Sequence, residues 1–269
     1  TDADVIAFCG VYFMAETAYI VNPERTVLLP DVNAGCPMAR MIDAATVDEL
    51  REKYSNAVVV CYVNSTAEVK AASDYCCTSA NAVQVVESIP EDRTVIFVPD
   101  RHLGNWVARQ TGREIVTHAG YCPTHVRITP EALTQLKTDH PDAVAMVHPE
   151  TPAETVDLAD VVTSTSGMLR FAGESDADKI IVGTEVGLIH RLQKENPEKK
   201  FLPATEAAVC PNMKKITPEK VLWSLEEMRY EILVPEPTCS RAREALDRML
   251  AVTRAGEMRE PARASTGSA

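Results

Sequence analysis

The 269-residue sequence has no apolar run long enough to cross a membrane. Its longest strongly apolar stretch covers residues 57–63, whereas a spanning helix needs about 20 such residues in a row. Positive charge is also scarce, because 27 Lys and Arg stand against 39 Asp and Glu and give a net charge of −12. Nucleic-acid binding needs clustered Lys and Arg to neutralise phosphates. The sequence therefore argues against a membrane partner and against a nucleic-acid partner.

A secretory signal is absent as well. The chain begins TDAD, without the basic and apolar regions of a signal peptide, and we expect a cytoplasmic protein. Disulfides are rare in that reducing compartment, so the eight cysteines are expected to be core residues, metal ligands or redox groups. Five lie in apolar or mixed stretches, which favours small buried side chains: Cys9, Cys61, Cys76, Cys77 and Cys239.

The other three cysteines share a signature. Cys36, Cys122 and Cys210 are each followed by Pro, and they are separated by 86 and 88 residues. Pro is favoured at the first helical position, which predicts a cysteine at a helix N-terminus, where the dipole and free N–H groups stabilise a thiolate. Three such cysteines at near-equal spacing indicate one site built from three equivalent units.

The same period extends along the chain. A shift of 86 residues places residues 57–64 on residues 143–150, and it places Asp74 on Asp160. The first unit joins this alignment from Asp4 onward. A fixed period of this kind indicates a repeat architecture.

A helix is expected to follow each cysteine, capped in turn by Thr46, Thr129 and Thr217. The last two caps are followed by Pro, which favours a helix start. Short apolar strands alternate with these helices, which is typical of parallel sheets. The sequence therefore predicts an α/β fold of three units around a pseudo-threefold axis.

The repeats are expected to have these bounds: 1–36 with 211–254, 37–122, and 123–210. A helix from Arg241 is expected to pack on the first repeat. Residues 255–269 lack apolar periodicity and are expected to form a disordered tail. The first repeat has no counterpart of the opening strand and loop of the others, so we expect an N-terminally truncated chain.

Polar side chains follow the expected strands. Tyr62 and Asn64 follow one strand, and His148 and Glu150 follow its counterpart in the next repeat. Ligands of open parallel sheets bind at the carboxyl ends of the strands. The sequence therefore predicts a polar pocket there, next to the three cysteines.

Ser79 and Thr165, which the repeat aligns with each other, lie in the turns that follow and are included in the site. They could also serve as helix caps. Asp31, Asp100 and Glu185 also come directly after strands, but they could equally be structural and are placed outside the site.

Three thiolates without a fourth equivalent cysteine suit a [4Fe–4S] cluster that keeps one iron open. An open iron can act as a Lewis acid on a carboxylate or hydroxyl, which suits dehydration chemistry. Zinc held by three cysteines and His125 is the alternative, although Cys-x2-Cys spacing, which zinc modules favour, is absent.

A set of motifs spans most of the chain: residues 8–18 (FCGVYFMAETA), 29–36 (LPDVNAGC), 62–70 (YVNSTAEVK), 77–81 (CTSAN), 120–125 (GYCPTH), 148–150 (HPE), 164–167 (STSG), 183–187 (GTEVG) and 210–214 (CPNMK). In these motifs the sequence resembles the quinolinate synthase (NadA-type) family of de novo NAD synthesis.

The resemblance implies three Rossmann-like, three-layer α/β/α domains around a pseudo-threefold axis, with a central [4Fe–4S] cluster held by Cys36, Cys122 and Cys210. It implies that iminoaspartate is condensed with dihydroxyacetone phosphate to quinolinate, with release of phosphate and water. L-aspartate oxidase or aspartate dehydrogenase would then supply the iminoaspartate.

By position, the resemblance implies that Glu150 is the general base and that His148 and Tyr62 are also catalytic. The residues expected to hold substrate are Tyr62, Asn64, Ser79, His125, His148, Glu150 and Thr165.

The chain departs from the family pattern in places. Tyr12 stands where the family usually has His, and Thr151 stands where it has Cys. The family's N-terminal His-x-Tyr element and a Ser that complete the pocket have no counterpart in the sequence. Two alternatives therefore stay open: a non-catalytic binder of dicarboxylates or phosphates, and zinc-dependent aldol-type chemistry.

Overall fold

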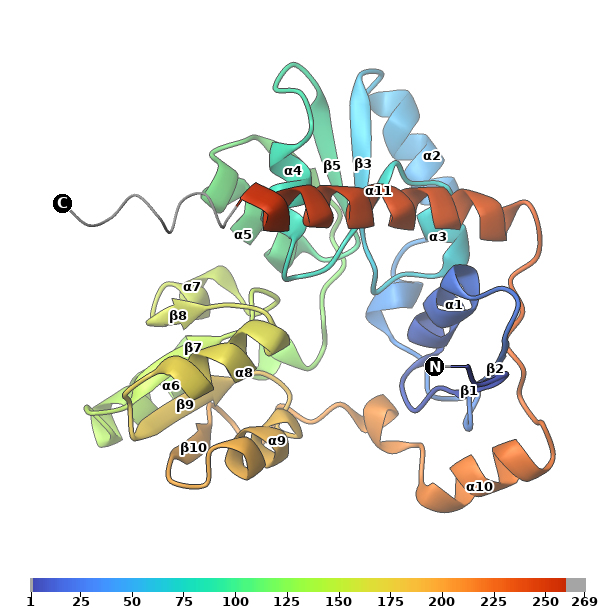
Figure 1. The fold of residues 1–269 in the computed structure, drawn as a ribbon. Coiled ribbons are helices and arrows are strands. Elements are labelled where there is room, and N and C mark those ends of the chain that lie inside the picture. The colour runs from blue at the N-terminus through green and yellow to red at the C-terminus, as the bar shows by residue number, and fades with distance from the viewer. Residues whose placement is uncertain (1, 260–269) are drawn as a thin grey trace.

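The computed structural model describes residues 2–259 (Figure 1). Its strands form three parallel sheets with helices packed against them, so the predicted α/β class with parallel sheets is confirmed. None of the helices in this range is long and apolar enough to cross a membrane.

The second sheet has the strand order β4-β3-β5-β6, with every neighbouring pair parallel. Its elements are α2 (Ala44–Lys53), β3 (Ala57–Tyr62), α3 (Ala67–Ala71), β4 (Tyr75–Cys77), α4 (Ala82–Glu87), β5 (Thr94–Val98), α5 (Arg101–Thr111) and β6 (Ile115–Thr117). The central strand β3 is buried at every position, which is why it reads as one continuous apolar run.

The third sheet repeats this order as β8-β7-β9-β10, again in parallel. Its elements are α6 (Pro130–Asp139), β7 (Val144–Val147), α7 (Ala153–Val156), β8 (Val161–Val162), α8 (Thr165–Glu174), β9 (Lys179–Gly183), α9 (Leu188–Glu195) and β10 (Lys200–Pro203).

The period of 86 residues holds at the level of single hydrogen bonds. The carboxylate of Asp74 accepts the N–H of Val59 at 2.8 Å, and the carboxylate of Asp160 accepts the N–H of Ala145 at 2.8 Å. Each of these residues lies 86 positions from its counterpart. The internal repeat read from the sequence is therefore confirmed for the second and third units.

The first sheet is smaller. It contains β1 (Val5–Ala7) and β2 (Thr26–Leu28), which pair directly and in parallel, with α1 (Tyr12–Val21) between them in sequence. In the other two sheets a central strand, β3 or β7, separates the counterparts of β1 and β2. The segment after α10 (Pro218–Glu226) joins β2 through an antiparallel bridge between Leu28 and Glu231.

The C-terminal helix α11 (Thr238–Arg259) packs on two repeats, whereas the sequence predicted packing on the first. It lies across the second repeat, against α3, α4 and β4, and it also packs on α1 of the first repeat, where Arg243 donates to the carbonyl of Ile20 (Figure 1). Its buried side chains, including Ala242 and Leu246, share a core with Val60 of β3. The prediction was incomplete because the helix also covers an apolar face of the second repeat, which sequence periodicity cannot locate. Residues 255–259 are helical, which contradicts the predicted tail there, and residues 260–269 lie outside the described range.

Two of the three predicted N-caps are confirmed. Thr129 and Thr217 each accept a backbone N–H at the start of a helix that has Pro in its first turn. Thr46 is not a cap, because α2 begins earlier and Asp43 accepts the N–H of Thr46 at 2.8 Å. An Asp carboxylate is a strong N-cap, and it takes this role from the Thr.

Candidate functional site

The three cysteines of the Cys-Pro pairs precede short turns rather than α-helices. The turns are single 3-10 segments: η1 (Met38–Arg40), η2 (His125–Arg127) and η3 (Pro211–Lys214). Only Cys210 is itself the N-cap. The predicted helix N-terminus is therefore confirmed only at Cys210, which caps a 3-10 turn that begins with Pro. At Cys36 and Cys122 the prediction is wrong, because the turn begins after the cysteine.

Burial decides the acidity of the Cys36 and Cys122 thiols. It raises the pKa of Cys36 to about 11, while the N–H groups of Ala39 and Met38 act in the opposite direction. Burial also raises the pKa of Cys122, and the charge of Glu150 adds to this effect. The turns alone therefore do not make thiolates of Cys36 and Cys122, and a bound cation would be needed to deprotonate these two cysteines.

One cavity of about 260 Å3 lies where the repeats meet. Its lining includes every residue that the sequence analysis placed in the site: Cys36, Cys122, Cys210, Tyr62, Asn64, Ser79, His125, His148, Glu150 and Thr165. Val11, Phe13 and Met14, around the start of α1, contribute an apolar wall. The structure thus brings together three thiols and a polar set from positions far apart in the chain.

Glu150 is the centre of a buried network. Its Oε1 accepts the O–H of Tyr62 at 2.5 Å, and its Oε2 lies 2.9 Å from Nδ1 of His125. Burial raises the pKa of Glu150, but the charge and hydrogen bond of His125 and the hydrogen bond of Tyr62 together hold it below its usual range. Donors from two repeats therefore keep this carboxylate ionised and fixed.

His148 belongs to the same network and connects Glu150 with Ser79. Its Nδ1 accepts the N–H of Glu150 at 3.3 Å, so the neutral ring carries its proton on Nε2, which lies 3.1 Å from Oγ of Ser79. Burial lowers the pKa of His148 to about 3. The ring is stacked on that of His125 with centroids 4.7 Å apart. A neutral imidazole in this position is an N–H donor to the cavity.

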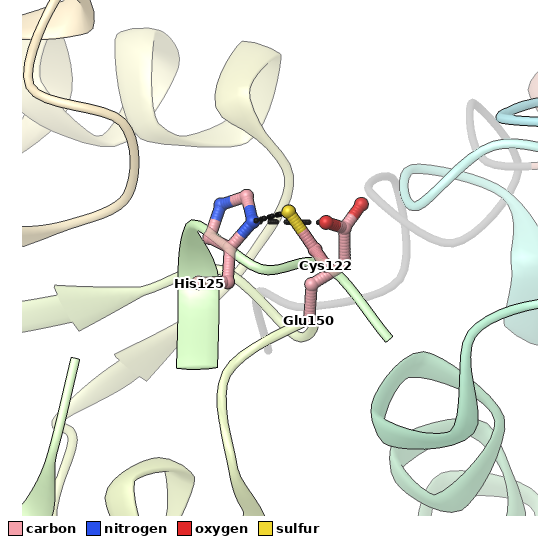
Figure 2. Close-up of side chains that lie close together, drawn as sticks. All are labelled: Cys122, His125 and Glu150. Carbon is pink, nitrogen blue, oxygen red and sulfur yellow. Dashed lines mark hydrogen bonds and ion pairs between the residues drawn. The ribbon is translucent and has the colours of Figure 1, made fainter. Parts of the chain in front are cut away.

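The polar part of the cavity lining contains a group of residues able to bind a metal ion. Donor atoms of Cys122, His125 and Glu150 all lie within 4.8 Å of one another. Figure 2 shows these three side chains close together. Nδ1 of His125 is 3.1 Å from the Cys122 sulfur and is shared with Glu150. A thiol, an imidazole and a carboxylate together are a donor set for transition metals.

Neither hydroxyl that could have been a helix cap has that role. Ser164, not Thr165, caps α8 by accepting the N–H of Gly167 at 3.2 Å, and α4 begins after Asn81 without a side-chain cap. Ser79 instead bonds His148. Both hydroxyls are therefore available at the cavity.

Sequence reasoning missed several residues around the site. Thr184 lines the cavity and lies 2.9 Å from Nε2 of His125. Glu185, which was set aside as structural, also lines the cavity and accepts the N–H of Cys210 at 3.2 Å. Both follow β9, so the strand-end rule that found His148 could have found them. Asp100 is fully buried behind the site and caps α5 through Leu103.

The repeated parallel sheets and this cavity define an α/β repeat protein with a candidate metal centre at the junction of its units. Residues 1–251 match the family described as Quinolinate synthetase A protein, and the chain belongs to this family. The family expected from the motifs is thus confirmed.

Three relatives illustrate the similarity. The chain is 54% identical over 252 residues to a quinolinate synthase of Dehalococcoides mccartyi, covering 94% of this chain and 83% of the relative. It is 51% identical over 250 residues to that of Methanosarcina barkeri and 50% identical over 250 residues to that of Thermodesulfovibrio yellowstonii. Both alignments cover 93% of this chain and 82% of the relative.

Proposed function

We propose that this chain is a quinolinate synthase, which condenses iminoaspartate with dihydroxyacetone phosphate and releases phosphate and water in de novo NAD biosynthesis. Membership of the family and identities of 50–54% to enzymes of that name support this function. The structural observation that carries it is the cavity on which the three thiols and the seven polar side chains predicted for the site converge.

The residues present fit an iron–sulfur centre. Cys36, Cys122 and Cys210 line the cavity, and the lining contains no further cysteine. Three thiolates would hold a [4Fe–4S] cluster and leave one iron without a protein sulfur. When bound, such a cluster supplies a Lewis acid for the loss of water. Zinc on the cysteines and His125 is the competing assignment.

The polar wall suits two anionic substrates. Carboxylates and phosphates need N–H and O–H donors, and we assign this role to the side chains that offer them: Tyr62, Asn64, Ser79, His125, His148 and Thr165. The net charge of −12 repels anions over the whole surface, so these local donors must supply the attraction.

Glu150 is assigned the general base. Removal of a proton next to an imine or carbonyl needs a carboxylate at the reacting carbon. His125 and Tyr62 each occupy one oxygen of Glu150 with a donated hydrogen bond, which leaves lone pairs for the substrate proton. Tyr62 and His148 act in catalysis by fixing this carboxylate and by facing the substrate.

Around this site we propose three Rossmann-like α/β/α domains on a pseudo-threefold axis, with the predicted bounds 1–36 with 211–254, 37–122, and 123–210. The repeated strand orders of the second and third sheets support this arrangement. Helix α11 packs on both the first and the second repeat and so joins the two.

Iminoaspartate is an imine that water hydrolyses, so an enzyme that oxidises aspartate must supply it. We assign this supply to L-aspartate oxidase or aspartate dehydrogenase. We also propose a cytoplasmic location, supported by eight cysteines that are all free.

Anaerobic reconstitution with iron and sulfide tests the proposal. We expect about four irons per chain, quinolinate formation, and loss of both when Cys36, Cys122 and Cys210 are changed together to Ser. Iron retained by the triple variant, or zinc in place of iron and sulfide, would contradict the cluster. Calorimetric binding of dihydroxyacetone phosphate without quinolinate formation would instead identify a non-catalytic binder.

A further inference from the structure

Lys70 is the largest fully buried side chain in the described part of the chain, and the mechanism above does not use it. It belongs to α3 of the second repeat, directly after the loop that carries Tyr62 and Asn64. Burial of a cation without a partner is costly. The groups that contact the buried Lys70 ammonium therefore show what its charge stabilises.

The Lys70 ammonium holds the loop from one side. Its Nζ donates to the carbonyl of Ser65, and it lies 5.5 Å from the ring centroid of Phe13. Ser65 in turn donates its hydroxyl to the carbonyl of Tyr62 at 2.9 Å. The cation thus connects the apolar cavity wall on α1 with the backbone that presents Tyr62.

Glu16 holds the same loop from the other side. It belongs to α1, which lies beside α3 (Figure 1), and it is only 6% exposed. Its Oε2 accepts the backbone N–H of Ala67 at 3.2 Å. Among the described residues Glu16 and Lys70 form no direct ion pair, so each binds the loop backbone instead of the other.

We propose that Glu16 and Lys70 are positioning residues that clamp the loop of residues 62–67 between α1 and α3, and so set where Tyr62 and Asn64 stand in the cavity. The inference rests on the proposed function for its kinetic consequence. The clamp itself depends only on the hydrogen bonds to the backbone of Ser65 and Ala67. Its two side chains come from two repeats, so the clamp also fixes α1 against the second sheet.

The effect on catalysis follows from distance. Tyr62 donates to the base Glu150 at 2.5 Å, and a misplacement of about 1 Å can cost about 100-fold in rate. Glu16→Ala removes the acceptor for Ala67, and Lys70→Met removes the donor to Ser65. Glu16→Gln keeps an acceptor oxygen, and Glu68→Gln, an exposed neighbour on α3, is the matched control.

The test uses reconstituted full-length protein. For Glu16→Ala we expect amide exchange of Ala67 to rise roughly tenfold and kcat/KM to fall about 10- to 100-fold, with unchanged iron content. Lys70→Met is expected to lower kcat/KM similarly. Glu16→Gln should recover to within about threefold of the wild-type kcat/KM, because it restores the hydrogen bond.

Unchanged Ala67 exchange in Glu16→Ala, or a kcat/KM equal to that of Glu68→Gln, would overturn the clamp. So would a Gln variant as impaired as the Ala variant, since that result means the hydrogen bond is not what matters. Should Lys70→Met fail to fold, the three Glu variants decide alone. If the wild-type protein makes no quinolinate, the proposed function fails, whereas Ala67 exchange still decides the clamp.

Discussion

The hydroxyl of Tyr62 donates a hydrogen bond of 2.5 Å to Glu150 across the boundary between two repeats. The repeat aligns Tyr62 with His148, 86 residues later, and Nδ1 of His148 lies 4.0 Å from the same Glu150 oxygen, Oε1. One repeat position therefore supplies a phenol in one unit and an imidazole in the next. The site gains its asymmetry because equivalent positions carry different side chains.

Tyr62→Phe is expected to lower kcat/KM by about 10- to 100-fold. The change removes one of the two donors that fix Glu150 and leaves a buried carboxylate oxygen unpaired, which costs about 1–3 kcal/mol of stability. Steady-state kinetics and urea unfolding measure the two effects. Tyr54→Phe, away from the cavity, is the control, and equal behaviour of the two variants would exclude the role of Tyr62.

The repeat predicts that Asp74 and Asp160 contribute equally to the free energy of unfolding. Both carboxylates accept a strand N–H at 2.8 Å, and both pair with a cation, Arg51 and Lys137 respectively, which are themselves 86 residues apart. The pairs are partly exposed, so screening reduces their contribution. We expect Asp74→Ala and Asp160→Ala each to lose about 1–2 kcal/mol of stability in urea unfolding. Losses that differ by more than about 1 kcal/mol would contradict this equivalence.

Sequence reasoning recovered the parts of this protein that repeat. The period located the cysteines, the strand-end rule located Tyr62 and His148, and the alternation of helix and strand indicated parallel sheets. It did not find the short strands β4, β6, β8 and β10, which have only two to four residues each. Strands this short carry too few side chains to show a pattern, and they exist because a longer neighbour pairs with them.

Contacts between repeats could not be predicted either. That Tyr62 would donate to Glu150, or that α11 would cover the second sheet, depends on how distant segments meet. The acidity of Cys36 and Cys122 was misjudged for a related reason, because burial acts on the folded thiol and outweighs the N–H groups of its own turn. Predictions from neighbouring residues were most accurate for interactions within one segment, such as the N-caps Thr129 and Thr217.

The eight cysteines are expected to react with a thiol reagent in an order that their burial sets. In the metal-free protein Cys9 is exposed and should be labelled first, and Cys61, Cys76 and Cys77 are fully buried and should stay unlabelled. The proposed ligands are partly exposed and should react more slowly than Cys9. After reconstitution they alone should become protected, as measured by mass spectrometry of the labelled peptides. Labelling of the ligand cysteines at an unchanged rate would show that they do not hold the cluster.

Glu16 gives the protein a pH-dependent stability of predictable sign. Burial raises the pKa of Glu16 from 4.5 to about 7, and the nearby Lys70 charge opposes this effect only in part. The native state therefore keeps this proton over a range in which the unfolded chain has released it, and stability is lost as pH rises from about 4.5 to about 7.

The Glu16→Gln variant has no carboxyl proton to release. The difference between its free energy of unfolding and that of wild type should therefore increase from about pH 4.5 to about pH 7 and stay constant above pH 7. The increase is at most about 3.5 kcal/mol, since the pKa rises from 4.5 to about 7 and one pKa unit is worth about 1.4 kcal/mol. Urea unfolding at pH 5 and at pH 8 measures it, with Glu68→Gln as the exposed control. A difference between Glu16→Gln and wild type that is the same at both pH values would show that Glu16 ionises normally in the folded protein.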